Sequence, residues 1–267
     1  MIVRARLKLK KVPGPWLNTE TLTFGSLDEF FSLSAESEKD WEYSVAWIDC
    51  VGGRSGHGRG VFFRGNHAAH DAATPFGRRR TVPFTPPISL VNGWSLRLFN
   101  SVYFRANQMW RGRNVTHYAP FFYPLDNVLD WNRIYGPKGF YQYQCVVPRL
   151  VERAAIGELL AAIARSGTGS LLAVLKTFGN RASAGLLSFP MAGTTLALDF
   201  PNLGDRTMCL FDRLNAIVLA AGGRIYPAKD ACMTRELFER GYPRLAEFMD
   251  HRDPRISSAM SRRLMGS

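Results

Sequence analysis

The amino-acid sequence predicts an α+β fold: a mixed, largely antiparallel sheet with helices on one face. Alternating apolar and polar residues mark several strands, which occur singly, in pairs and between helices. Apolar residues at helical spacing mark other segments as amphipathic helices, some with recognisable caps. No internal repeat is visible, so one sheet layered with helices is the expected architecture.

The N-terminal part is expected to contain three strands and one helix. Residues 3–10 alternate apolar with cationic side chains, which predicts a strand with one cationic face. Further strands are expected at 17–24 and 42–49. Between them, Ser26 and Glu29 have the spacing of a capping box, which predicts that a helix begins there.

Residues 52–90 are expected to form a long, exposed and flexible loop, because Gly, Pro, Arg and His dominate and periodicity stops. His67, His70 and Asp71 would share a face only in a helix, which no cap or apolar stripe supports. No metal site is therefore predicted. The glycine-rich run 52–60 lacks the strand-to-helix context of a phosphate-binding loop.

Beyond residue 90 the pattern predicts helices alternating with strands. Gly167 and Gly222 each follow a predicted helix, where glycine commonly ends one. Helices are expected at 151–165 and 205–221 and from about 234 and 254, with a short helical stretch through 131–135; strands are expected at 139–148, 171–176 and 194–200, and a strand and turn at 224–230.

Composition bounds the class of protein. The 267 residues are 46% hydrophobic and 21% charged, as in globular proteins, but the net charge of +12 favours an anionic partner. The four cysteines form no CxxC pair, so reduced thiols in a cytoplasmic protein are expected. The N-terminus has no signal-peptide core, and no apolar run approaches the ~20 residues that span a bilayer.

The strand at 139–148 carries the most informative polar residues. Gln142 and Gln144 project on one face, whereas aromatic residues and a cysteine line the other. Buried amides cost free energy unless their donors and acceptors are bonded. The pair therefore indicates either a wall that binds a polyhydroxyl ligand or two amides bonded to neighbouring backbone or water, and the residues alone leave both open.

Lys176, Tyr226 and Lys229 extend this polar set at the ends of other predicted strands. Lysines near aromatic residues can stabilise developing negative charge or bind phosphate. The alternative is that both lysines are ordinary surface residues. No GxSxG, HExxH or P-loop motif accompanies them.

Seven blocks favour the binding interpretation: 122–126, 131–136, 140–144, 175–179, 187–190, 198–201 and 222–230. In order and spacing they resemble the C-terminal half of the decaprenylphosphoryl-β-D-ribose oxidase family, FAD-linked oxidoreductases of the vanillyl-alcohol-oxidase superfamily. The resemblance implies that 1–13 ends a flavin-domain sheet, 14–222 is a substrate-binding cap domain, and 223–267 is a helical tail that returns to the flavin domain. The N-terminal FAD-binding domain would be absent.

The resemblance also implies roles for single residues. Lys229 and Tyr226 would be catalytic and would face both FAD and substrate, with Lys229 supporting negative charge on reduced flavin. Six residues would bind substrate: Gln142, Gln144, Lys176, Phe122, Thr195 and Ala197. The first three match the family pattern. The family's pocket asparagine, cysteine and tyrosine are replaced by Thr195, Ala197 and Phe122, which leaves the substrate open.

The expected function is therefore the substrate-binding part of an FAD-dependent oxidoreductase that oxidises a sugar or other alcohol by hydride transfer. FAD is not expected to be held by this chain alone, so an FAD-binding domain or protein would be its partner. The alternatives are a decayed fragment, or a non-enzymatic module that uses Arg78–Arg80 and the cationic face of 4–10 on anionic lipid or, less favoured, nucleic acid. Peripheral contact of 52–90 with a membrane also stays open.

Overall fold

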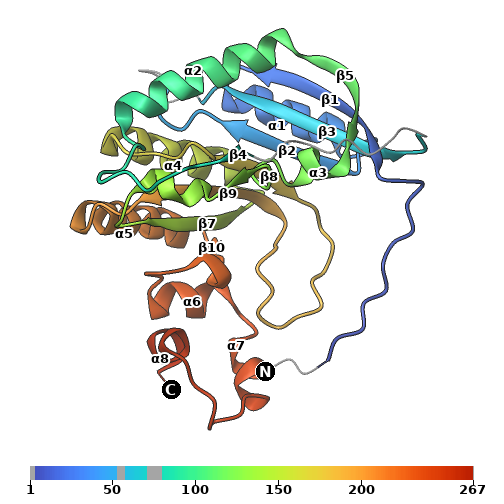
Figure 1. Ribbon diagram of the computed structural model, residues 1–267. Helices are drawn as coiled ribbons and strands as arrows, with labels where there is room; N and C mark the ends of the chain where they lie inside the picture. The colour runs from blue at the N-terminus through green and yellow to red at the C-terminus, as the bar shows by residue number, and fades with distance from the viewer. Residues whose placement is uncertain (1–3, 53–57, 71–79, 267) are drawn as a thin grey trace.

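The computed structural model describes residues 4–52, 58–70 and 80–266. Its centre is a fully antiparallel sheet of eight strands, in the order β10-β7-β9-β8-β2-β3-β1-β5 (Figure 1). This confirms the α+β prediction. The strands are β1 (Trp16–Phe24), β2 (Tyr43–Ile48), β3 (Gly60–Ala68), β5 (Gly112–His117), β7 (Phe140–Pro148), β8 (Val174–Phe178), β9 (Gly193–Pro201) and β10 (Arg224–Ile225), and a separate parallel pair joins β4 (Arg80–Thr81) to β6 (Val128–Leu129).

The prediction of helices on one face is wrong in this respect, because helices lie on both faces of the sheet (Figure 1). The core side chains of the strands point toward α1, α4 and α5, whereas on the other face the ring of Tyr103 in α2 lies 4.8 Å from that of Trp47 in β2. The helices are α1 (Leu27–Ser37), α2 (Gly93–Met109), α3 (Tyr118–Phe122), α4 (Glu152–Ser166), α5 (Asp205–Ala220), α6 (Arg235–Gly241), α7 (Leu245–Asp250) and α8 (Ala259–Met265), with 3-10 helices η1 (Trp131–Tyr135) and η2 (Pro227–Lys229).

Local sequence signals set the ends of several helices. Before α1, the hydroxyl of Ser26 accepts a hydrogen bond from the backbone N–H of Glu29 at 3.3 Å, while the Glu29 carboxylate accepts from Gly25 at 2.7 Å. These bonds satisfy N–H groups that have no partner inside the helix. After α4, Gly167 adopts φ 67°, a left-handed conformation that glycine enters without strain.

The prediction of a loop over 52–90 is wrong for its middle part. Residues 60–68 form β3, paired with β1 and β2 inside the sheet. Val61 and Phe62 are both buried although they point to opposite faces, so the strand lacks the apolar–polar alternation that marks a half-exposed one. His67 lies in this strand, and Asp71 falls outside the described residues, as do 53–57 and 71–79.

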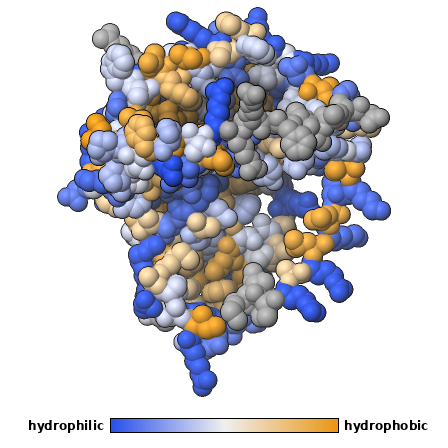
Figure 2. Space-filling model, in the orientation of Figure 1, coloured by the Kyte–Doolittle hydropathy of each residue, from blue (hydrophilic) through white to orange (hydrophobic). Residues whose placement is uncertain are grey.

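The prediction of a strand at the N-terminus is also wrong for the described residues 4–10, which form no strand. This segment runs away from the sheet toward the C-terminal helices, and Leu7 and Leu9 are about four-fifths exposed (Figures 1 and 2). Alternation predicts a strand only where a neighbouring strand completes its hydrogen bonds, and no described strand pairs with this segment.

The C-terminal tail packs against the chain's own core. Leu237, Phe238 and Tyr242 join the main core, and the Tyr242 hydroxyl donates to the carbonyl of Ile225 at 2.7 Å. Packing of the tail on a flavin domain remains a prediction. Among the described residues, no helix combines the length and apolar character needed to cross a membrane.

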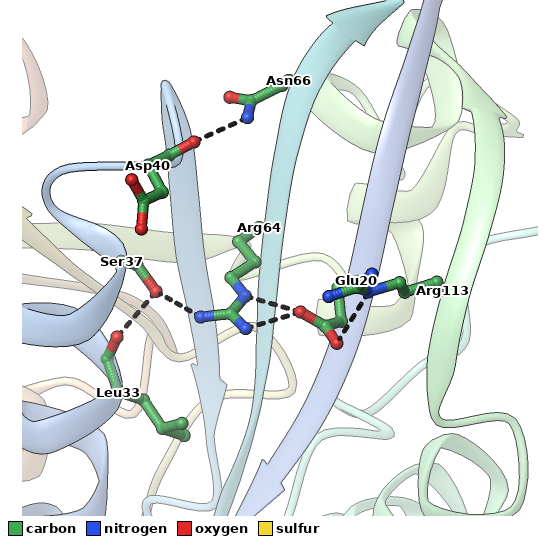
Figure 3. A network of polar contacts seen from close by, with 7 residues as sticks. All are labelled: Glu20, Leu33, Ser37, Asp40, Arg64, Asn66 and Arg113. Carbon is green, nitrogen blue, oxygen red and sulfur yellow. Dashed lines mark hydrogen bonds and ion pairs between the residues drawn. The ribbon is translucent and has the colours of Figure 1, made fainter.

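A polar network fastens α1 to the sheet beyond the main core (Figure 3). Arg64 in β3 donates to Glu20 in β1 at 2.8 Å and to the hydroxyl of Ser37 in α1 at 3.0 Å, and Arg113 in β5 lies 3.5 Å from the other Glu20 oxygen. Desolvation alone would raise the pKa of Glu20, but Arg64 and then Arg113 hold this pKa below its usual value.

Glu20→Gln is expected to destabilise the fold by about 2 kcal/mol at pH 7, because it leaves a mostly buried guanidinium without its counter-charge. The pKa of Glu20 is lower in the folded than in the unfolded protein. The contribution of Glu20 to the free energy of unfolding is therefore complete above the unfolded pKa and is lost as the pH falls through the folded pKa. Urea unfolding of both proteins between pH 7 and pH 3 tests this. A difference that stays constant across that range would contradict it.

Candidate functional site

The predicted site residues of β7, β8 and β9 lie on one face of the sheet. The register places Gln142 opposite Asp199, Gln144 opposite Ala197, and Lys176 opposite Thr195. Their sequence neighbours point the other way, into the core beneath α4 and α5. The period of two that predicted a shared face for the glutamines therefore holds across three strands.

Each glutamine is held by one hydrogen bond to the next strand. Gln142 Nε2 donates to Asp199 Oδ1 at 3.1 Å, and Gln144 Nε2 donates to Thr195 Oγ1 at 3.2 Å. Both side chains are half-buried, and among the described residues neither Oε1 has a partner. The protein therefore fixes one side of each amide, as the structural interpretation predicts, and binding of a ligand by the carbonyl oxygens stays a prediction.

Asp199 is a member of this face that the sequence interpretation missed. It is 7% exposed, and burial raises the pKa of its carboxyl, although the hydrogen bond from Gln142 and the charge of Lys229 oppose the rise. Asp199 sits in an apolar strand, so only the register with β7 reveals that it faces Gln142. A buried carboxylate with a raised pKa beside polar side chains is a common feature of active sites.

Two lysines give this face positive charge. Lys176 is exposed by surface area, yet surrounding protein displaces enough water to lower the pKa of its ammonium group, and repulsion from Lys229 lowers the pKa further. Neither lysine makes an ion pair with a carboxylate within 4 Å among the described residues. Their charge is therefore available to an anionic or electron-rich ligand.

Tyr226 and Lys229 lie at the edge of the same region, at the two ends of η2. The backbone N–H of Tyr226 donates to the carbonyl of Gln144 at 2.8 Å, which fixes this turn beside β7. The Tyr226 ring packs 4.7 Å from Phe189 in the β8–β9 connection. Beyond the turn, Asp230 accepts from Arg263 of α8 at 2.7 Å, so the tail helps to hold Lys229 in place.

Thr195, Ala197 and Phe122, which stand where the family has other pocket residues, lie in different surroundings. Thr195 is 2% exposed; its hydroxyl donates to the carbonyl of Cys145 at 2.8 Å and accepts from Gln144, so it helps to hold that glutamine in place. Ala197 lies between Gln144 and Val174 and is half-buried. Phe122 is 37% exposed in α3, with its ring 4.9 Å from Tyr43 of β2, and no contact joins it to the glutamines.

None of the predicted residues lines the hollow of about 570 Å³ at the β1–β5 edge, which is bounded by Asn18, Thr19, Trp41, Asn66, Arg113, Asn114 and Val115. We place the candidate site on the glutamine face because that is where the charged and amide side chains converge. In the described ranges no three His, Cys, Asp or Glu side chains come together in a group that could hold a metal ion.

Comparison with known proteins finds homologues of this chain. No family model matches the chain. The chain is 32% identical over 281 residues to decaprenylphosphoryl-β-D-ribose oxidase of Mycolicibacterium smegmatis, an alignment that covers 99% of the chain and 60% of that relative. It is 28% identical, over 99% of its length and 77% of the relative's, to an uncharacterized protein in the mprA 5′ region of Streptomyces coelicolor. The chain is therefore a homologue of an oxidase and spans about 60% of that oxidase's length.

Proposed function

We propose that this chain supplies the substrate-binding wall of an FAD-dependent oxidoreductase that oxidises a sugar or other alcohol. The supporting observation is one sheet face on which two amide oxygens, a buried carboxylate and two unpaired lysines lie together. Amide and carboxylate oxygens accept hydrogen bonds from hydroxyl groups, so this set suits a polyhydroxyl ligand. Homology to an oxidase supplies the reaction class.

The residues at the edge of this face fit one side of a flavin. Lys229 is half-buried and free of any ion pair with a carboxylate in the described part of the chain, so its ammonium can stabilise negative charge on a reduced isoalloxazine. The Tyr226–Phe189 pair offers an adjoining aromatic surface. When bound, FAD would supply the hydride acceptor. Its pyrophosphate is proposed to be held by residues outside this chain, in a flavin-binding domain or partner protein.

The chain's own residues would then position the alcohol. Gln142 and Gln144 accept hydrogen bonds from substrate hydroxyls, and their fixed amide groups limit how the substrate can turn. Asp199 accepts the proton of the reacting hydroxyl as the carbinol C–H bond breaks and the carbonyl forms, a step that its raised pKa favours. Lys176 and Lys229 keep the region positive, which would favour negative charge on a reduced flavin and a substrate that carries negative charge.

Absorption spectroscopy tests whether this chain needs a separate flavin-binding part in order to hold FAD. The purified chain is expected to be colourless, and a stoichiometric flavin spectrum is expected only after it is produced together with the part of the M. smegmatis relative that it does not cover. Flavin bound stoichiometrically by the chain alone would contradict the proposed division. Failure of the two parts to associate, shown by separate elution in gel filtration, would contradict the proposed partner.

A further inference from the structure

The outward face of α2 is apolar, although it is open to solvent in the described part of the chain. Leu96 and Asn100 of this helix are buried against the protein. At about 100° per residue, four apolar side chains lie within an arc of about 80° on the opposite side. These residues, called here the α2 stripe, are Trp94, Leu98, Val102 and Met109, and they are 57 to 79% exposed.

Exposed apolar residues also flank the helix at both ends of its sequence. Trp110, the residue that ends α2, is 75% exposed. Ile88 and Leu90, in the segment that leads into α2, are 73% and 53% exposed. Such a surface on a helix that already has a buried side needs an occupant, because exposed apolar side chains of this number are uncommon on monomeric proteins.

The charge around the α2 stripe has one sign. Residues 72–125 contain seven arginines and no aspartate or glutamate. Arg97, Arg105 and Arg111 are exposed and make no ion pair with any described carboxylate. Arg105 falls inside the arc of the stripe, where its long aliphatic stem can lie on apolar surface while the guanidinium reaches phosphate groups above it.

Together these features fit a lipid surface. Helices that lie in a bilayer interface carry large apolar residues on one face and arginine or lysine beside them. Tryptophan favours the headgroup level of a bilayer, and the stripe has one at its start and another just past its end. In Figure 1, α2 runs along the outer margin of the molecule, and Figure 2 shows apolar and basic side chains mixed over that margin.

We propose that α2 docks this protein on an anionic bilayer, with the α2 stripe inserted at the boundary of the acyl chains and Arg97, Arg105 and Arg111 on lipid phosphates. Since α2 crosses the same side of the sheet as Gln142 and Gln144, docking would turn the glutamine face toward the lipid side of the molecule. The docking itself is independent of the oxidoreductase proposal.

Sedimentation with vesicles tests the docking surface. The full chain is expected to bind phosphatidylcholine vesicles that contain phosphatidylglycerol, and to bind pure phosphatidylcholine at least about tenfold more weakly. Leu98→Gln with Val102→Gln, and separately Arg97→Gln with Arg105→Gln, are each expected to weaken binding to the mixed vesicles about tenfold. The matched control is Leu150→Gln with Ile256→Gln, two exposed apolar residues elsewhere, which should leave binding unchanged.

Tryptophan fluorescence provides a second readout, in which Leu98, Val102 and the arginines stay unchanged. Brominated lipids should quench part of the emission of the full chain, and Trp94→Phe with Trp110→Phe should remove that quenched part. Circular dichroism of every variant confirms that each is folded, as expected for substitutions at exposed positions.

Four outcomes would overturn the proposal. They are failure of the unmodified chain to bind anionic vesicles, unchanged vesicle binding by the Leu98→Gln and Val102→Gln variant, self-association in solution that this variant abolishes, and binding to DNA that replaces binding to vesicles.

Discussion

Lys229→Met, made in the chain joined to its flavin-binding partner, is expected to lower the rate of substrate oxidation by about 100-fold or more. The ammonium of Lys229 is proposed to stabilise negative charge that develops during hydride transfer, and losing one such group typically costs a factor of about 100 to 1,000. Methionine keeps most of the side-chain volume. Because no ion pair holds Lys229 to a described carboxylate, stability should change little.

Stopped-flow measurement of flavin reduction under anaerobic conditions checks this prediction. Lys138→Met serves as the matched control, since Lys138 is an exposed lysine outside the glutamine face. Lys176→Met should weaken substrate binding more than it slows the chemical step. A Lys229→Met protein that is folded, binds flavin and reduces it at the unmodified rate would remove Lys229 from the site.

Asp199→Asn is expected to make the fold more stable at pH 7 and the enzyme about 100-fold slower. Burial raises the pKa of the Asp199 carboxyl, so folding costs free energy when this group is ionised. The stability that this group contributes is therefore complete below its unfolded pKa and is lost as the pH rises through its folded pKa. Asparagine carries no charge to bury and still accepts from Gln142, but it cannot take a proton from the substrate.

Thermal unfolding between pH 3 and pH 7 tests the predicted effect on stability. The stability that Asp199→Asn gains over the unmodified protein should become smaller as the pH falls. Asp49→Asn is the contrasting variant: Asp49 is 2% exposed but pairs with Arg59 at 3.1 Å, so neutralising it should destabilise the fold. If Asp199→Asn were less stable at pH 7 and equally active, Asp199 would be a structural residue and no part of the reaction.

The sequence predicted correctly those features that depend only on residues close together along the chain. Ser26 and Glu29 marked the start of α1 because both capping bonds lie within four residues. The shared face of Gln142 and Gln144 followed from the period of a strand. In contrast, β3 was missed because α1 and α2 contact it and both Val61 and Phe62 are buried, which removes the alternation that marks a half-exposed strand.

The partners of the site residues could not be read from the sequence for the same reason. Asp199 and Thr195 meet the glutamines only through the pairing of β7 with β9, and 50 or more residues separate each bonded pair. At residues 4–10 a strand was predicted but none is formed, because alternating residues need a neighbouring strand to pair with. Register and pairing decide these cases, and both depend on the whole sheet.

The most direct measurement is anaerobic reduction of flavin in the reconstituted pair by a panel of sugars and sugar phosphates, each also deuterated at the carbinol carbon. At least one compound is expected to bleach the flavin, with a primary isotope effect on the rate, and Gln142→Ala with Gln144→Ala should raise the concentration needed for half-maximal rate about tenfold or more. Bleaching that is equally efficient after both glutamines are removed would show that the substrate lies elsewhere and would contradict the proposed site.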